Sequence, residues 1–211
     1  MKKLVCLFMA IMVLCSVALV GCGGINANTD PADITSSIVT EKEWREACSF
    51  IGMRDRGYEL INEIEYPVMK KLSATVKFKS IVEDAEINYN YDFVSINKEN
   101  FNWACKVKVS TNYNGQKLEE EREISSPITQ SNGYSHAFYE LREYMDSVVG
   151  DFNEFSYDQE KGAYCKTIDE EFDSGEEREL LLKFKGNRLV CYQEISFVSD
   201  REMSIIFYNY N

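Results

Sequence analysis

The side chains of this sequence with the most reactive chemistry are a single histidine and seven cysteines. A histidine acts as a general base only where an acid or a nucleophile is held against it. His136 stands at the start of a predicted helix, where exposed polar residues are common. The chain contains no Gly-x-Ser-x-Gly, Ser-x-x-Lys, His-Glu-x-x-His or phosphate-loop pattern. We therefore expect a protein that is not an enzyme and has no catalytic residues.

Metal binding is the second chemistry to consider. The run Asp169–Glu177 has acids at the first, third and fifth places of a calcium loop, but its glycine falls one place late and the final ligand position is Leu180. The cysteine spacings match no zinc pattern. We expect no metal and no cofactor. The sequence leaves open whether the cysteines of the later chain are buried thiols or disulfides; these are Cys48, Cys105, Cys165 and Cys191.

The first 22 residues have the layout of a secretory signal. Lys2 and Lys3 precede an uncharged apolar run from Leu4 to Val20, and small polar residues follow. An uncleaved transmembrane helix is the alternative. The run is just short of the roughly 18–20 residues that span a bilayer, and no basic cluster follows it. The pattern favours a signal peptide.

The end of this segment, Leu19-Val20-Gly21-Cys22, resembles the lipobox of bacterial lipoproteins. In that family the cysteine sulfur is diacylated and the peptide bond before the cysteine is cleaved. The resemblance implies signal cleavage between Gly21 and Cys22, lipid attachment at Cys22, and anchoring at the extracytoplasmic face of the cell membrane. Two or more acyl chains hold a protein on a bilayer stably.

The chain is acidic, with a formal net charge of −12. The charge becomes more negative when Lys2 and Lys3 leave with the signal. Nucleic-acid binding needs a basic surface, so we expect no nucleic-acid partner. Solubility is sufficient to explain the acidic balance.

The sequence divides into three parts. Residues 1–21 form the signal peptide, and residues 22–39 are small, polar and without period, which predicts a flexible tether. Such a coil would reach roughly 20–25 Å. Residues 40–211 are long enough for a single domain with its own core.

Two helices are predicted in the domain. Thr40 and Glu43 form a capping box, and the apolar spacing that follows predicts a helix from Glu41 to about Phe50. A second apolar stripe at Phe138, Leu141 and Met145 predicts a helix over 135–149.

Period-two alternation predicts strands through most of the remaining chain. Asn114-Gly115 predicts a two-residue hairpin, and the charged strand after it is expected at a sheet edge. Leu180, Leu182 and Phe184 form one expected inward set. Cys191, Gln193, Ile195 and Phe197 form another. The predicted strands are 58–66, 72–78, 85–93, 101–109, 116–124, 152–157, 163–172, 176–185, 188–198 and 201–210.

The start of the domain, Thr40-Glu-Lys-Glu-Trp44, and its strands rich in tyrosine and acid resemble uncharacterised lipoproteins of single-membrane bacteria. The element order is also similar to the LolA/LppX-like carrier fold, in which a curved antiparallel sheet wraps around helices and holds an acyl chain. We therefore expect an α+β domain with one large curved antiparallel sheet of about nine to ten strands covered by two helices. The predicted domain differs from the prototype carriers in two ways. It has only one clear helix after the fifth strand, and its inward residues are rich in tyrosine.

Each predicted helix and strand is apolar on one side only, so the helices are expected to pack on one face of the sheet. In the resembling carriers the space between them holds the ligand. The corresponding hydrophobic pocket would be lined by Ala74, Val76, Trp103, Val107, Phe138, Leu141, Met145, Leu180, Leu182 and Phe184.

Two functions remain open. The first is a non-catalytic, membrane-anchored lipoprotein that binds a lipid, another amphiphile or a hydrophobic peptide inside the sheet. The second is an interaction or sensor lipoprotein with a filled core, whose acidic surface contacts a protein or cell-wall carbohydrate. An empty apolar cavity would favour the first function, and a filled core would favour the second.

The lipobox resemblance predicts that Cys22→Ser releases the protein from membranes or leaves an unprocessed precursor, because the variant lacks the sulfur that would carry the acyl chains. Detergent phase partitioning and migration on a gel measure both effects. A variant that partitions and migrates like the wild type would contradict lipid attachment at Cys22.

Overall fold

The computed structural model describes residues 25–48, 71–80, 84–97, 102–127, 139–145, 152–169, 177–197 and 200–210. The predicted signal peptide, the lipid site Cys22, the strand expected at 58–66 and His136 lie outside the described residues.

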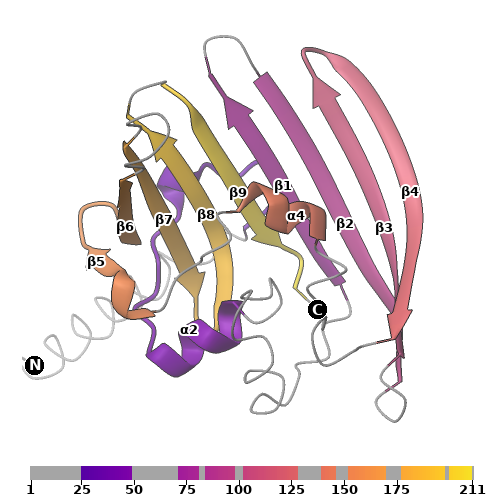
Figure 1. Ribbon diagram of the computed structural model, residues 1–211, viewed down its shortest axis with the longest axis horizontal. Helices are drawn as coiled ribbons and strands as arrows, with labels where there is room; N and C mark the ends of the chain where they lie inside the picture. The colour runs from indigo at the N-terminus through magenta and orange to yellow at the C-terminus, as the bar shows by residue number, and fades with distance from the viewer. Residues whose placement is uncertain are drawn as a thin grey trace, which may run out of the picture.

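The described chain forms one antiparallel sheet of nine strands in the order β4-β3-β2-β1-β9-β8-β7-β6-β5 (Figure 1). The α+β class and the single large antiparallel sheet are thereby confirmed. The first four strands form one half of the sheet and the last five form the other, with β1 and β9 paired at the junction. The strands are β1 Lys71–Lys79, β2 Asp84–Asn97, β3 Asn102–Tyr113, β4 Gln116–Pro127, β5 Ser156–Asp158, β6 Ala163–Asp169, β7 Glu177–Lys185, β8 Arg188–Ser196 and β9 Glu202–Tyr208.

Local turn chemistry sets the register of the β3–β4 hairpin. Asn114 and Gly115 have φ angles of 47° and 84°, which the two-residue hairpin turn requires. The turn pairs Tyr113 with Gln116, and the pairing continues to Asn102 and Pro127. β4 lies at the sheet edge as expected, and its charged side chains discourage pairing with another molecule.

The first helix, α2, spans Glu41–Cys48 and begins with the expected capping box. The Glu43 carboxylate accepts from the backbone N–H of Thr40 at 2.7 Å, and the Thr40 hydroxyl accepts from the backbone N–H of Glu43 at 3.3 Å. The hydrogen bonds from Thr40 lower the pKa of the Glu43 carboxyl. The helical expectation for residues 49–50 lies outside the described part.

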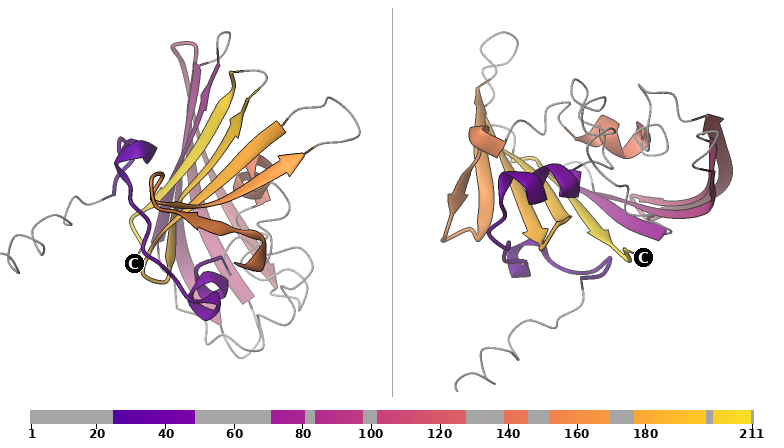
Figure 2. Two further views of the ribbon diagram at one scale, coloured as in Figure 1. Left: turned by 90° about the vertical axis from the view of Figure 1, so that its left-hand side faces the viewer. Right: turned by 90° about the horizontal axis from the view of Figure 1, so that it is seen from below.

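The second helix, α4, is described over Tyr139–Tyr144, with Met145 after it. The other residues of the helix expected at 135–149, including Phe138, lie outside the described part. Figure 2 shows the sheet bending toward the side on which α4 lies.

The face of the sheet toward α4, here called the inner face, carries the main hydrophobic core. Alternate residues of the strands contribute to it, among them Leu72, Val76, Val107, Leu182 and Ile205. The opposite, outer face is polar over β1–β4 and carries a small apolar cluster of Ile34, Val190, Cys191 and Ile206.

The expected inward set on β8 is wrong. A register shift between Lys183 and Phe184 in the β7–β8 pairing marks a bulge. Leu189 faces inward, Val190 and Cys191 both belong to the outer cluster, and Tyr192 faces inward again. An extra residue reverses the side-chain parity of the rest of a strand. Gln193 and Ile195 therefore share the face of Cys191, and Phe197 is 56% exposed.

The segment Ile25–Val39 packs along the domain, which differs from the flexible tether expected over 22–39. We call this segment the strap. Backbone N–H groups of Ser36 and Ser37 donate to the carbonyls of Gly162 and Phe184, at 2.7 and 2.8 Å. The buried Lys183 ammonium donates to the carbonyl of Pro31 at 2.7 Å. These bonds satisfy polar groups on both sides, so the strap belongs to the fold.

The strand expected at Phe152–Tyr157 is a 3₁₀ turn, η4, over Phe152–Glu154 followed by the short β5. Phe152 and Phe155 both pack on the core. Their spacing of three residues matches one 3₁₀ turn and not the alternation of a strand.

Two isoleucines of the strap provide a matched test of its packing. Ile34 is 3% exposed and Ile38 is 77% exposed. We expect Ile34→Ala to lower the free energy of unfolding by roughly 2–4 kcal/mol, because it leaves a cavity in the outer cluster. Ile38→Ala should change it by less than about 0.5 kcal/mol. Urea unfolding measures both values, and a neutral Ile34→Ala would mean that the strap does not hold to the sheet.

Candidate functional site

The inner face brings together most residues expected to line a hydrophobic pocket. All of those with described side chains belong to the one core cluster and are at most 4% exposed. The side chain of Trp103 and the whole of Phe138 lie outside the described part. The gathered residues are Ala74, Val76, Val107, Leu141, Met145, Leu180, Leu182 and Phe184.

The half of the inner face beside α2 is filled by aromatic rings. Trp44 of α2 is completely buried, and its ring centroid lies 4.8 Å from that of Phe184 and 5.0 Å from that of Phe155. Phe152 and Tyr164 meet the same indole edge to face at 5.7 and 5.3 Å. Such packing uses the space that a ligand would need.

The Tyr164 hydroxyl fixes the strap to this aromatic cluster. It donates to the carbonyl of Val39 at 3.2 Å and accepts from the Val39 N–H at 2.9 Å. Both polar groups of the residue before the α2 cap are thus satisfied inside the core. The α2 half of the inner face is therefore a closed structural core.

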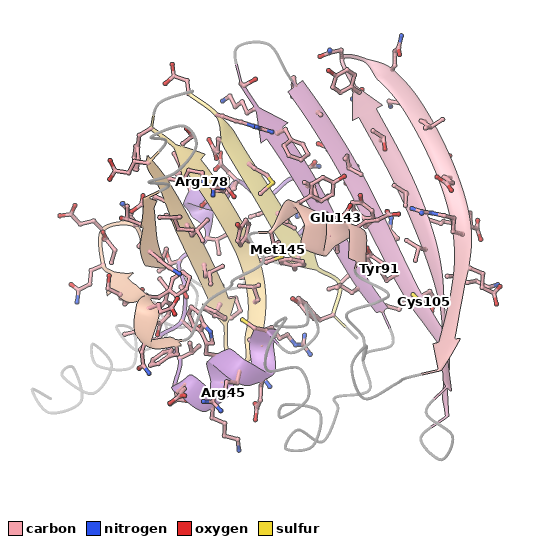
Figure 3. The ribbon with its side chains drawn as sticks, in the orientation of Figure 1. Arg45, Tyr91, Cys105, Glu143, Met145 and Arg178 are labelled. Atoms are coloured by element: carbon pink, nitrogen blue, oxygen red, sulfur yellow. The ribbon has the colours of Figure 1, made fainter. Side chains whose placement is uncertain are left out.

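The other half of the inner face lies under α4 and has a different character. Its floor includes Tyr89 and Tyr91 of β2, which are 2% and 3% exposed and stack on each other at 6.1 Å. Leu141 and Met145 bury their side chains in the same cluster. Figure 3 labels Tyr91, Cys105 and Met145 in this region. The half-buried Tyr144 packs edge to face on Phe78 at 5.4 Å.

Two polar contacts hold α4 over this floor. Arg122 of the edge strand β4 binds the Glu140 carboxylate with both terminal nitrogens, at 2.5 and 2.7 Å. This pairing raises the pKa of the Arg122 guanidinium. The second contact joins the hydroxyls of Tyr89 and Tyr144 at 3.3 Å.

The Arg122–Glu140 pair lies at the rim of the site and not inside it. Each side chain is 35% exposed, so water screens the pair and its contribution to stability is small. This pair was not expected from the sequence. The available signal was the one arginine of β4, which stands among glutamates on the inward parity opposite Val107.

The floor under α4 excludes charge. Burial, followed by the hydrogen bond with Tyr144, raises the pKa of the Tyr89 phenol. Burial also raises the pKa of Tyr91, and it raises that of the Cys105 thiol to about 12. All three groups are neutral at ordinary pH. These three side chains therefore give the floor no charge, which suits contact with an apolar chain and a neutral hydrogen-bonding group.

A polar depression of about 770 Å³ lies at the other end of the sheet, beside β5 and β6. Glu154, Asp158, Glu160 and Glu179 line it together with Lys166. Lys166 pairs with Glu154 at 2.7 Å, and Lys161 pairs with Glu179 at 2.5 Å. This depression was not expected from the sequence, because its residues come from three segments. Among the described residues, no group of three or more histidine, cysteine or acidic side chains could hold a metal.

The four cysteines of the described part, Cys48, Cys105, Cys165 and Cys191, are free thiols. Cys48, Cys105 and Cys191 are buried, and Cys165 is partly buried. Burial raises the pKa of Cys191 to about 12 and that of Cys165 to about 11. The acidic run at 170–176 lies outside the described residues, and Leu180 after it is fully buried in the core.

No protein-family model matches this chain, and no curated protein matches it. Within the described residues, no helix is both long and apolar enough to cross a membrane.

The burial of the thiols predicts their order of reactivity. We expect iodoacetamide to modify Cys165 in the native protein and to modify Cys48, Cys105 and Cys191 only after unfolding, because the thiolate is the reactive form. Labelling of Cys165 should accelerate as the pH rises toward its pKa of about 11. Peptide mapping by mass spectrometry assigns each site. Peptides joined by a disulfide, or equal labelling of all sites in the native protein, would contradict this arrangement.

Proposed function

We propose that this chain is an extracytoplasmic lipoprotein, anchored to the cell membrane through Cys22, that holds a lipid acyl chain or another hydrophobic ligand between the inner face and α4. The main observation in favour is the construction of the α4 half. An apolar floor there is almost inaccessible to water, and its described cover is a short helix held by polar contacts at the rim.

Movement of α4 would be the way into this site. The Arg122–Glu140 pair is partly exposed, and lifting α4 would also admit water to the buried Tyr89 hydroxyl, so both contacts can exchange for bonds to water at small cost. The main cost of lifting α4 is exposure of the apolar floor, at roughly 25 cal/mol per Å². An acyl chain that enters the same space would cover the floor again and offset that cost.

The proposed architecture is a curved sheet with both helices on its inner side, as in the carriers that the sequence resembles. In this arrangement α2 closes one half and α4 is the movable cover of the other. The inward tyrosines then have a role, because the hydroxyls of Tyr89 and Tyr144 could bond a polar group of the ligand. We therefore favour an amphiphile over a purely apolar molecule.

A filled-core interaction protein is the second candidate. The aromatic packing around Trp44 supports it, since no ligand fits there without displacing rings. The polar depression near Glu154 and Glu179 would be one place for its acidic surface to meet a partner. In this case α4 is a structural helix and the inner face binds nothing.

Uptake of a fluorescent fatty acid by the delipidated protein separates the two functions. We expect the wild type to take it up and Ala74→Trp to lose uptake, because the added indole fills inner-face space next to Tyr89. Glu140→Gln should speed uptake severalfold, because it weakens the rim contact with Arg122. Stopped-flow fluorescence measures amplitude and rate. A wild-type protein without uptake would leave the interaction protein as the function.

Glu143→Gln is the matched control, since it removes the same charge from an exposed position of the same helix. It should leave the uptake rate unchanged. Circular dichroism of Ala74→Trp shows whether the variant keeps the β-rich fold. Equal acceleration by Glu140→Gln and Glu143→Gln would assign the effect to net charge and not to movement of α4.

A further inference from the structure

The strap begins against the outer face of the sheet. Ile25 packs on the cluster of Ile34, Val190, Cys191 and Ile206. A turn closed by the Thr29 N–H donating to the Asn26 carbonyl at 3.1 Å follows, and the Asp30 side chain then caps the 3₁₀ turn η1 at Pro31–Asp33. The chain is thus fixed to the domain from Ile25 onward.

This packing limits the distance between the domain and the proposed lipid anchor. Three peptide units separate Cys22 from Ile25. A fully extended chain spans at most about 3.3–3.6 Å per residue, so the two Cα atoms lie within about 11 Å of each other. The flexible tether expected from the sequence would have reached roughly 20–25 Å.

The side chains near Ile25 suit a lipid–water interface. Tyr208 and Tyr210 pack on the same outer cluster as Ile25. The Arg188 guanidinium lies 5.2 Å from the centre of the Tyr210 ring. The Tyr210 hydroxyl is buried and donates to the Leu189 carbonyl, so the partly exposed Tyr208 and the exposed Arg188 are the groups here that could meet lipid headgroups. Tyrosine is enriched at that boundary, and an arginine fork can bind lipid phosphate.

We infer that the outer face around Ile25, Tyr208 and Tyr210 rests on the surface of the bilayer that carries the acyl chains of Cys22. This inference rests on the lipid attachment in the proposed function. The membrane surface is the occupant because the chain before Ile25 is too short to hold the domain away from it. The inner face and α4 then point away from this bilayer, and a ligand reaches them from the opposite side.

Energy transfer from a fluorophore on the protein to a headgroup-labelled lipid tests the orientation. The full lipoprotein is reconstituted in vesicles of phosphatidylglycerol and phosphatidylethanolamine, with Cys165→Ser removing the partly buried thiol. One variant carries the fluorophore at Asn187→Cys, next to Arg188, and the other at Glu143→Cys on α4; both native side chains are exposed. The first position is beside the outer cluster, and the second lies over the inner face, on the side expected to point away from the bilayer.

We expect severalfold stronger transfer from position 187 than from position 143. A Gly-Ser insertion of about 20 residues between Gly24 and Ile25 should remove the difference, because it restores a long flexible tether. Equal transfer from both positions, or stronger transfer from position 143, in protein without the insertion would overturn the orientation.

The mass of the N-terminal peptide separates this failure from failure of the proposed anchor. An acylated Cys22 with the wrong transfer pattern rejects the orientation alone. An unmodified Cys22, in protein that does not float with the vesicles, rejects the anchor and the orientation together.

Discussion

The structure depends on covering one apolar face of a single open sheet. Alternation along the strands places the large side chains on the inner face, and that face must be shielded from water. Two helices meet this need in the described part, and a third segment covers a small apolar cluster on the outer face. α2 covers the half formed by β6–β8 through Trp44, and α4 lies over the half formed by β1–β3. The strap covers the apolar outer cluster at β8 and β9 through Ile34.

The two halves of the inner face are held by different forces. Around Trp44, ring contacts and the paired hydrogen bonds of Tyr164 leave little that can move without loss of the fold. At α4 the described helix is short, and its ion pair with Arg122 is partly exposed to water. Local opening draws on regions with few buried contacts and exposed hydrogen bonds. Conformational change is therefore expected at α4 and not at α2.

The strap connects the fold to the proposed anchor. The buried side chain of Lys183, on the outer face of the sheet, donates to the carbonyl of Pro31. Burial lowers the pKa of its ammonium group. Ser36 and Ser37 extend the hydrogen bonding at the ends of β6 and β7. Because of these contacts, the strap is part of the domain and not a flexible spacer. The fold thereby restricts the orientation that an anchored domain can take.

The sequence by itself determined the features that depend on neighbours along the chain. Alternation predicted β1–β3 and β7, Asn114-Gly115 predicted the hairpin, and Thr40 with Glu43 predicted the start of α2. Each of these follows from local backbone geometry or from bonds within a few residues. The apolar set of the inner face followed for the same reason.

Only the tertiary structure decided the features that depend on distant partners. The bulge beside Phe184 reversed the faces of Cys191 and Ile195, because register is a property of two strands together. The strap has no periodic pattern, and its order comes from Tyr164, Gly162 and Lys183, which lie more than 120 residues away. The rim pair of Arg122 and Glu140 forms only when the sheet brings β4 beside α4. Such contacts leave no periodic trace in the sequence because the chain between the partners can vary in length and composition.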